Sequence, residues 1–152
     1  MSVDSEVWRD IPGYENLYQV SNLGRVKSLP RKVRTISRNG IRGWRIFPGR
    51  ILKLMVYHFG HLYVELSKEG KIARYSAHVL VLTTFVGPCP EGMVCRHFPD
   101  KDPANNRLDN IKWGTREENE ADKLFHGTDN RAENIRGVNR WTGIGCRKKE
   151  AL

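Results

Sequence analysis

Residues 93–113 combine two short apolar segments with a long polar stretch between them. Met93–Cys95 is typical of a strand, and Asn110–Trp113 is typical of a second one. The stretch between them, residues 99–109, contains too few apolar side chains to be anything but a loop. This part of the sequence therefore predicts two strands joined by a polar loop.

A capped helix is expected directly after the second strand. Thr115 and Glu118 have the spacing of a capping box, in which the two side chains satisfy free backbone N–H groups at the helix start. Gly127 is typical of a helix end. The order strand, loop, strand, helix indicates an α+β fold. The apolar side chains expected on the buried face of this helix are Ala121, Leu124 and Phe125.

The chain upstream of residue 93 is rich in strand signals. Ser76 can cap a short apolar helix over residues 77–85. Residues 30–49 are basic and interrupted by Gly and Pro, which indicates an extended loop or hairpin. The β-rich segments expected around them are residues 6–29, 51–57, 61–67 and 71–75.

Positive charge is concentrated in one third of the chain. No Asp or Glu occurs between Asn16 and Val64, whereas the basic residues elsewhere are nearly balanced by the 17 Asp and Glu. The cations of this span would repel one another without a polyanion, so a nucleic-acid contact surface is expected in preference to a solvated basic face. An anionic membrane is the weaker alternative, because Gly and Pro interrupt the amphipathic helix that it would need. The candidate DNA-binding residues are Arg25, Lys27, Arg31, Lys32, Arg34, Arg38, Arg42, Arg45, Arg50 and Lys53.

The cysteines and the N-terminus indicate the cellular compartment. Cys89, Cys95 and Cys146 form no CxxC pair, so neither a disulfide framework nor a structural zinc site is expected. The N-terminal residues lack the features of a signal peptide, and no apolar run approaches the ~20 residues of a membrane span. We therefore expect the protein in the cytosol.

Three polar residues lie in order along the strand, loop, strand, helix unit: His97 at a strand end, Asn110 on the second strand and Asn119 one turn into the helix. The string Asn-Asn-Arg-Leu-Asp-Asn-Ile-x-Trp-Gly-Thr surrounds the second of them. Together these residues resemble the ββα-metal active site of HNH endonucleases. The resemblance implies an endonuclease that hydrolyses phosphodiesters of double-stranded DNA with Mg²⁺ or Mn²⁺.

A second resemblance lies near the N-terminus. The segments Trp8–Glu15, Tyr18–Asn22 and Gly24–Ser28 look like the nuclease-associated modular motif, which precedes an HNH domain in phage and intron-encoded homing endonucleases. This similarity implies a phage or mobile-element protein. The implied domains are a basic, strand-rich DNA-binding module over residues 1–54, an HNH ββα-metal nuclease core over 55–128 and a basic tail over 129–152.

The resemblance implies a role for each of the three polar residues. His97 would be the general base, since an imidazole with a pKa of ~6.5 is largely neutral at cellular pH. Asn110 would bond the second ring nitrogen or a nearby backbone group and so orient the ring. Asn119 would be an oxygen ligand of the metal ion. Each also has a structural alternative. His97 could simply pack at the strand end, Asn110 could satisfy the loop backbone, and Asn119 could be a solvated helix residue.

Arg96 departs from the family pattern. Many members carry Asp immediately before the His as a second metal ligand, and an arginine cannot bind a cation. Metal binding would then depend on Asn119, the substrate phosphate and water, while Arg96 would clamp a phosphate oxygen. The same departure raises the alternative of a catalytically degenerate, HNH-derived DNA-binding protein. An RNA-binding module is a third possibility that the basic span permits.

The other histidines are not assigned to a site. His78 matches the helix-start His of the family and is expected to be structural. His58, His61 and His126 have no ligand partner at a convincing sequence spacing. The sequence leaves open the recognition site, nicking as against double-strand cutting, and whether the protein is a monomer or a dimer.

Overall fold

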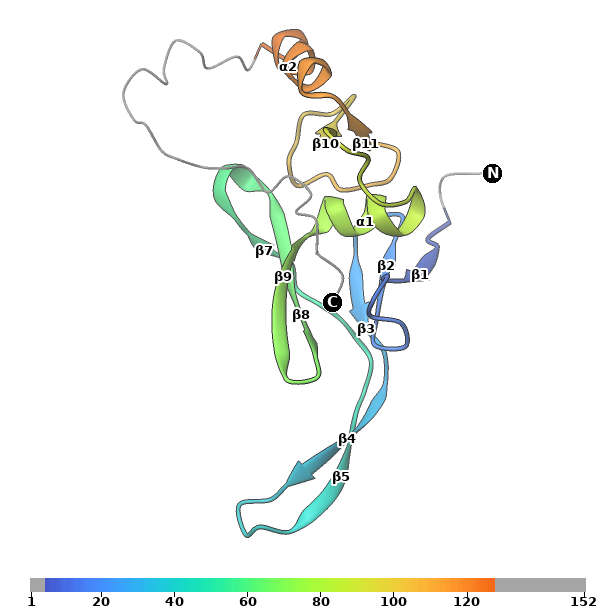
Figure 1. The fold of residues 1–152 in the computed structure, drawn as a ribbon, viewed down its shortest axis with the longest axis vertical. Coiled ribbons are helices and arrows are strands. Elements are labelled where there is room, and N and C mark those ends of the chain that lie inside the picture. Colours follow the sequence, from blue (N-terminus) through green and yellow to red (C-terminus); the bar gives the residue numbers. More distant parts are fainter. Residues whose placement is uncertain (1–4, 128–152) are drawn as a thin grey trace.

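The computed structural model describes residues 5–127, which form four small antiparallel sheets and two α-helices (Figure 1). The α+β prediction is confirmed. The first sheet has the strand order β1-β2-β3-β6, with a turn at Pro12-Gly13 between β1 and β2 and a turn at residues 21–24 between β2 and β3. Its strands are β1 (Trp8–Asp10), β2 (Tyr18–Ser21), β3 (Val26–Ser28) and β6 (Arg50–Ile51).

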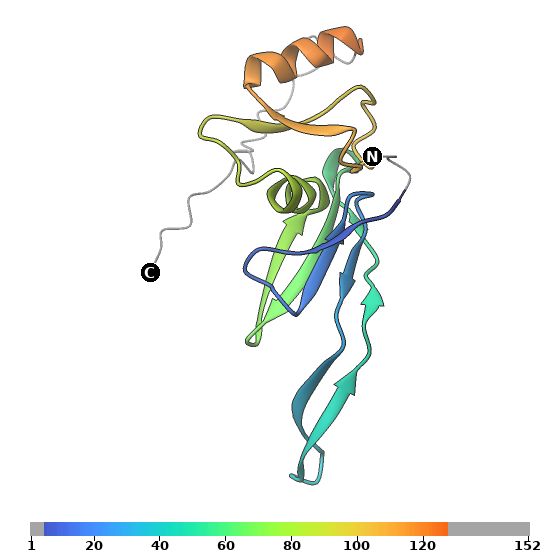
Figure 2. The same cartoon turned by 90° about the vertical axis from the view of Figure 1, so that its right-hand side faces the viewer.

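The basic stretch forms a β-hairpin that projects from the body of the molecule. Strand β4 (Arg31–Ile36) pairs with β5 (Arg42–Phe47) over six residue pairs, from Arg31 opposite Phe47 to Ile36 opposite Arg42. None of its residues is buried. Both views show the hairpin extending away from the two helices (Figures 1 and 2).

A three-stranded sheet with the order β7-β8-β9 follows the hairpin. Its strands are β7 (Met55–Val56), β8 (Leu62–Lys68) and β9 (Lys71–Ser76). A single 3-10 turn, η1 (His58–Gly60), connects β7 to β8 and contains Phe59 at a φ of 59°. This turn reverses the chain between the two antiparallel strands, and His61 lies between the turn and β8.

Helix α1 (Ala77–Phe85) joins these sheets into one core. It contacts β1 and β2 of the first sheet, β8 and β9 of the three-stranded sheet, and β11 of the strand, loop, strand, helix unit. Its residues Leu80, Val81 and Leu82 are buried in one hydrophobic cluster. The sheets contribute Val20, Leu66 and Ile111 to the same cluster. The apolar composition of residues 77–85, which predicted a core helix, is therefore explained by burial on several sides.

The expected strand, loop, strand, helix unit is present. Strand β10 (Val94–His97) pairs with β11 (Ile111–Gly114), and α2 (Arg116–Phe125) follows. The capping box is confirmed, because Thr115 accepts a hydrogen bond from the Glu118 N–H and the Glu118 carboxylate accepts one from the Thr115 N–H.

The buried face predicted for this helix is wrong. Leu124 and Phe125 are 60% and 76% exposed, and the buried residue of α2 is Asp122. An acidic side chain is stable at this position because its partner on β10 is Arg96. Charge pairing rather than apolar contact therefore fixes this face of α2 against the sheet.

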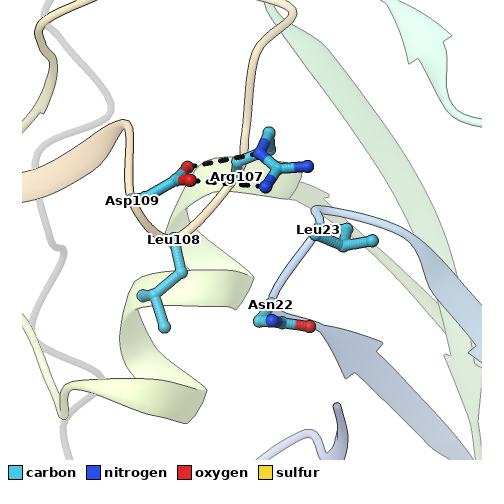
Figure 3. A pocket seen from close by; sticks show the side chains of 5 residues that line it. All are labelled: Asn22, Leu23, Arg107, Leu108 and Asp109. Atoms are coloured by element: carbon cyan, nitrogen blue, oxygen red, sulfur yellow. Dashed lines mark hydrogen bonds and ion pairs between the residues drawn. The ribbon is translucent and has the colours of Figure 1, made fainter. Parts of the chain in front are cut away.

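A turn of the N-terminal sheet packs against the long loop between β10 and β11. The Leu108 N–H donates to the Asn22 carbonyl over 2.8 Å, and a Cβ added to Gly24 would lie 2.9 Å from the Cβ of Asn106. A pocket lies beside this contact, with the Arg107–Asp109 ion pair facing Leu23 and Asn22 (Figure 3). Residues far apart in the sequence therefore hold the loop in place.

The expected boundary at residue 54 between module and nuclease core stays a prediction, and both segments contribute to a single hydrophobic cluster. The tail over 129–152 lies outside the described residues. Neither described helix is long and apolar enough to cross a membrane.

Candidate active site

His97 is the last residue of β10 and lies opposite Ile111 of β11. Its side chain is half-buried, and this desolvation lowers its pKa below the ordinary histidine value. Its Nε2 lies 3.4 Å from the Oδ1 of Asn106, which orients the ring. The ring is therefore neutral at physiological pH and has a defined direction, as a general base requires.

Asn106 is a functional candidate that the sequence analysis missed. It is 3% exposed, and its amide nitrogen donates to the Ala104 carbonyl over 3.2 Å. This hydrogen bond directs its Oδ1 toward the ring of His97. The Asn-Asn doublet in the matching string was the available signal, but spacing alone did not show which Asn reaches the imidazole.

Asn110 organises the loop backbone rather than the ring. Its Oδ1 accepts from the Asp100 N–H over 2.8 Å, and its amide nitrogen donates to the carbonyls of Asp100 and Asn105 over 3.0 and 3.2 Å. It is 4% exposed. Asn110 was expected to bond either the His97 ring or a nearby backbone group, and in the structure it bonds the backbone.

Arg96 is 8% exposed and lies between two carboxylates of α2. Its Nε and Nη2 both donate to Asp122 over 2.7 Å, and its Nη1 lies 2.9 Å from Glu118. The guanidinium holds the pKa of Asp122 below its usual range through this paired hydrogen bond. Gly114 leaves room for the arrangement, because a Cβ there would collide with the Arg96 side chain.

The signal for the Arg96 contacts was present in the sequence of α2. Glu118 and Asp122 are four residues apart, so they lie on one face of the helix. Two like charges at this spacing repel each other unless a cation lies between them. The spacing of Glu118 and Asp122 thus predicts a cation beside this face of α2.

Asn119 lies in the first half of α2, which packs against β10. Its backbone N–H donates to the Thr115 carbonyl over 3.1 Å, and its side chain is half-buried. An amide oxygen at this position is a donor suited to a hard divalent cation.

Three histidines meet at the end of β10. The ring centroids of His61, His78 and His97 are 5.2 to 5.5 Å apart in all three pairs. Burial lowers the pKa of His61, and that of His78 falls to about 3 mainly through burial. His61, which has no partner at a convincing sequence spacing, thus lies beside two histidines that come from α1 and β10.

The candidate basic residues differ in their contacts. On the body, Arg25 pairs with Glu6, while Lys27 lies 4.2 Å from the centre of the Trp8 ring. At the base of the hairpin, the Nη2 of Arg31 donates to the Tyr18 hydroxyl over 3.3 Å. The remaining candidates in this part of the chain are Lys32, Arg34, Arg38, Arg42, Arg45, Arg50 and Lys53.

Pairing places some of the hairpin cations on one face. Lys32 lies opposite Ile46, and Arg34 lies opposite Trp44. Opposite residues in an antiparallel pair share a face, so cations and large apolar side chains alternate there. Trp44 and Ile46 are 62% and 72% exposed, and Lys32 lies 5.2 Å from the centre of the Trp44 ring.

Comparisons with known proteins identify two family segments. Residues 6–67 match the NUMOD4 motif, and residues 75–121 match the HNH endonuclease family. DNA endonuclease I-HmuI of Bacillus phage SP01 is 32% identical over 123 residues, which is 81% of this chain and 60% of that protein. The chain thus spans less than two thirds of this relative.

A solved structure is similar to this chain in both sequence and fold. The structure titled DNA binding and cleavage by the HNH homing endonuclease I-HmuI aligns with a TM-score of 0.65 at 31% identity. The alignment covers 84% of this chain and 63% of that one. Sequence and fold therefore agree over both family segments.

Proposed function

Because the chain belongs to the HNH endonuclease family and carries an N-terminal NUMOD4 motif, we propose that it is a divalent-metal-dependent endonuclease of double-stranded DNA. The observation that carries the proposal is a half-buried His97 at the end of β10, with its ring directed by Asn106. A phage or other mobile genetic element is the proposed source, since the relative is a phage protein.

His97 acts in this proposal as the general base that takes a proton from the attacking water. Its lowered pKa leaves the imidazole neutral at pH 7, so it is ready to accept a proton. Asn106 is a positioning residue, because its Oδ1 fixes the direction of the ring. Asn110 supports both by tying Asp100 and Asn105 of the loop to the start of β11.

A hard divalent cation, Mg²⁺ or Mn²⁺, fits the oxygen donor of Asn119. The position before His97 offers no ligand, since the Arg96 side chain is paired with Asp122 and Glu118. Mg²⁺ commonly keeps several waters and binds through one or two protein oxygens together with substrate phosphate. When bound, such an ion stabilises the negative charge on the leaving oxygen.

Arg96 has a positioning role in this proposal, in place of the phosphate contact expected from the sequence. Its donors on the α2 side are used by two carboxylates. These contacts attach α2 to β10 and so set where Asn119 lies relative to His97. Preorganisation of this kind is what a catalytic site built on two elements requires.

The proposed DNA-contact surface is the β4–β5 hairpin together with the basic residues of the first sheet. The hairpin projects from the body (Figure 1) and carries most of the acid-free span's cations that have no carboxylate partner within residues 5–127. Arg25 contributes less, because Glu6 neutralises it. A two-stranded ribbon of this kind fits the width of the major groove.

Incubation of supercoiled plasmid with the protein and Mg²⁺, with and without EDTA, tests the function. We expect a metal-dependent product, as relaxed circles if one strand is cut and as linear DNA if both are. His97→Ala should lower the cleavage rate at least ~100-fold, because general-base catalysis contributes about 10²–10⁴-fold. Its DNA affinity should stay within a few-fold of wild type, because phosphate contacts elsewhere supply most of it.

His58→Ala is the matched control, because His58 is an exposed histidine of η1 outside the HNH segment. It should cleave at the wild-type rate. Equal rates for His97→Ala and wild type would refute the assignment of the base. DNA binding without a metal-dependent product on any DNA would favour the degenerate DNA-binding protein instead.

A further inference from the structure

We propose that His61, His78 and His97 together bind a borderline transition-metal ion such as Zn²⁺, and that an ion bound there inhibits DNA cleavage. The metal site itself follows from the positions of the three side chains. The inhibition rests on the proposed function, because it requires His97 to be the general base.

The three histidines come from different elements. His61 precedes β8, His78 lies in the first turn of α1, and His97 ends β10. Each offers a ring nitrogen, and these nitrogens all lie within 4.8 Å of one another. In a tetrahedral zinc site they would lie about 3.3 Å apart, given Zn–N bonds of about 2.0–2.1 Å. Closure by about 1.5 Å is within the reach of side-chain rotation, since imidazole χ2 angles are broad.

The chemical state of the donors suits a metal. The Nδ1 atoms of His61 and His78 are buried and have no hydrogen-bond partner among the described residues. Buried polar atoms are rarely left unsatisfied, so each such atom calls for an explanation. Metal binding also requires neutral imidazoles, and burial keeps all three rings neutral.

The donor set selects the class of ion. Neutral imidazole nitrogens favour Zn²⁺, Cu²⁺ and Ni²⁺, whereas Mg²⁺ prefers oxygen ligands. Three protein ligands leave a fourth tetrahedral position for water. The site therefore differs from the proposed Mg²⁺ position at Asn119 both in its ligands and in the ion that it selects.

Occupancy would remove the general base. Coordination uses a lone pair of the His97 ring and places two positive charges beside it, so the ring loses its basicity. The ion would also join α1 to β10 and to the start of β8. A ligand that binds only the folded state raises the melting temperature, so zinc binding should be visible as thermal stabilisation.

Direct metal binding is the first test, on wild-type protein without DNA or Mg²⁺. Titration with Zn²⁺ in a calorimeter should give one site per chain, and Co²⁺ as a probe should give the visible absorption of a tetrahedral complex. His61→Phe keeps an aromatic ring but no donor atom, so its affinity for Zn²⁺ should fall at least about tenfold. His58→Phe removes an exposed histidine outside the cluster and should bind Zn²⁺ as wild type does.

His61→Gln provides a second variant with a smaller change in packing, and melting curves establish that each variant is folded. Absence of a wild-type zinc site would overturn the proposal. Unchanged zinc affinity in a folded His61→Phe or His61→Gln protein would do so too.

Inhibition is the second test, with plasmid cleavage at saturating Mg²⁺ and increasing Zn²⁺. Each rate is divided by the zinc-free rate of the same variant. The Zn²⁺ concentration for half-inhibition should rise at least about tenfold in His61→Phe and stay unchanged in His58→Phe. Zinc binding without inhibition would refute the inhibitory role. Zinc binding by a protein that cuts no DNA would instead refute the proposed function and leave the metal site standing.

Discussion

The Arg96 guanidinium holds two carboxylates of α2 against the end of β10. Its pair with Asp122 is shielded from water, whereas the Glu118 side chain is 53% exposed. A buried charge is tolerated because its partners satisfy it, so the loss of one partner is costly. A functional site that depends on Asn119 of α2 and His97 of β10 therefore depends on a residue that need touch neither substrate nor metal.

Replacement of Arg96 by Met should lower the free energy of unfolding by about 2 kcal/mol, since it leaves Asp122 buried without its charged hydrogen bonds. Arg96→Asp should be less stable than Arg96→Met, because it adds a third carboxylate beside Asp122 and Glu118. Urea unfolding at pH 7 measures both variants. Arg74→Met, which removes an exposed ion pair with Glu65, should change stability little.

The contribution of this pair should also depend on pH in a defined direction. The pKa of Asp122 is lowered in the folded protein, so its stabilising effect is complete above the unfolded Asp pKa of about 3.9. It is lost as the pH falls through the folded pKa. The stability difference between wild type and Arg96→Met should therefore be constant near neutrality and shrink below about pH 4. A difference that does not change down to pH 2 would contradict the ion pair.

The β4–β5 hairpin combines exposed cations with exposed apolar side chains on one face. Lys32 and Arg34 flank Trp44 there, and neither strand contributes a buried residue. Such an element adds little to the core, and its composition is what supports the proposed contact with DNA. Arg31 differs from these residues, because it anchors the hairpin to Tyr18.

Lys32→Gln with Arg34→Gln should flatten the dependence of log affinity on log salt by about two units, at about 0.9 for each phosphate contact. Duplex affinity measured between about 50 and 200 mM salt gives this slope. Lys68→Gln with Lys71→Gln is the matched control, since these lysines flank the turn of another hairpin outside the acid-free span. Equal slopes for the two double variants would mean that the hairpin face does not contact DNA.

Besides the shared core around α1, the two family segments meet in a close contact beside His97. The turn at residues 21–24 of the NUMOD4 segment packs on Asn106 and Leu108 of the HNH segment. Asn106 in turn orients His97. The N-terminal segment thus supports the loop between β10 and β11 that orients His97, and it also carries the proposed DNA-contact surface.

Gly24→Ala should reduce both stability and cleavage, because the added Cβ would lie 2.9 Å from Asn106 at a φ of +84°. Gly13→Ala is the matched control, with a φ of +82° and open space around the added Cβ. It should lose only the about 1–2 kcal/mol of left-handed strain and keep the wild-type cleavage rate. Urea unfolding measures the stability of the Gly24→Ala and Gly13→Ala proteins, and plasmid cleavage measures their activity. Equal losses of stability and activity would show that the contact is unimportant.

Local signals in the sequence were sufficient for most elements. The capping box at Thr115 and Glu118 depends only on residues three apart, so it could be recognised without a fold. The strands around His97 and the apolar helix α1 were found for the same reason. The matching string around Asn110 indicated the nuclease family, which the comparisons confirm.

Tertiary structure decided the partners of the polar side chains. His61, His78 and His97 are far apart in the sequence and meet only because α1 packs on β8 and on β11, the partner strand of β10. The buried face of α2 was mispredicted since the partner of Asp122 is an arginine on another element. Local periodicity reports which side chains share a face, whereas long-range packing determines what that face contacts.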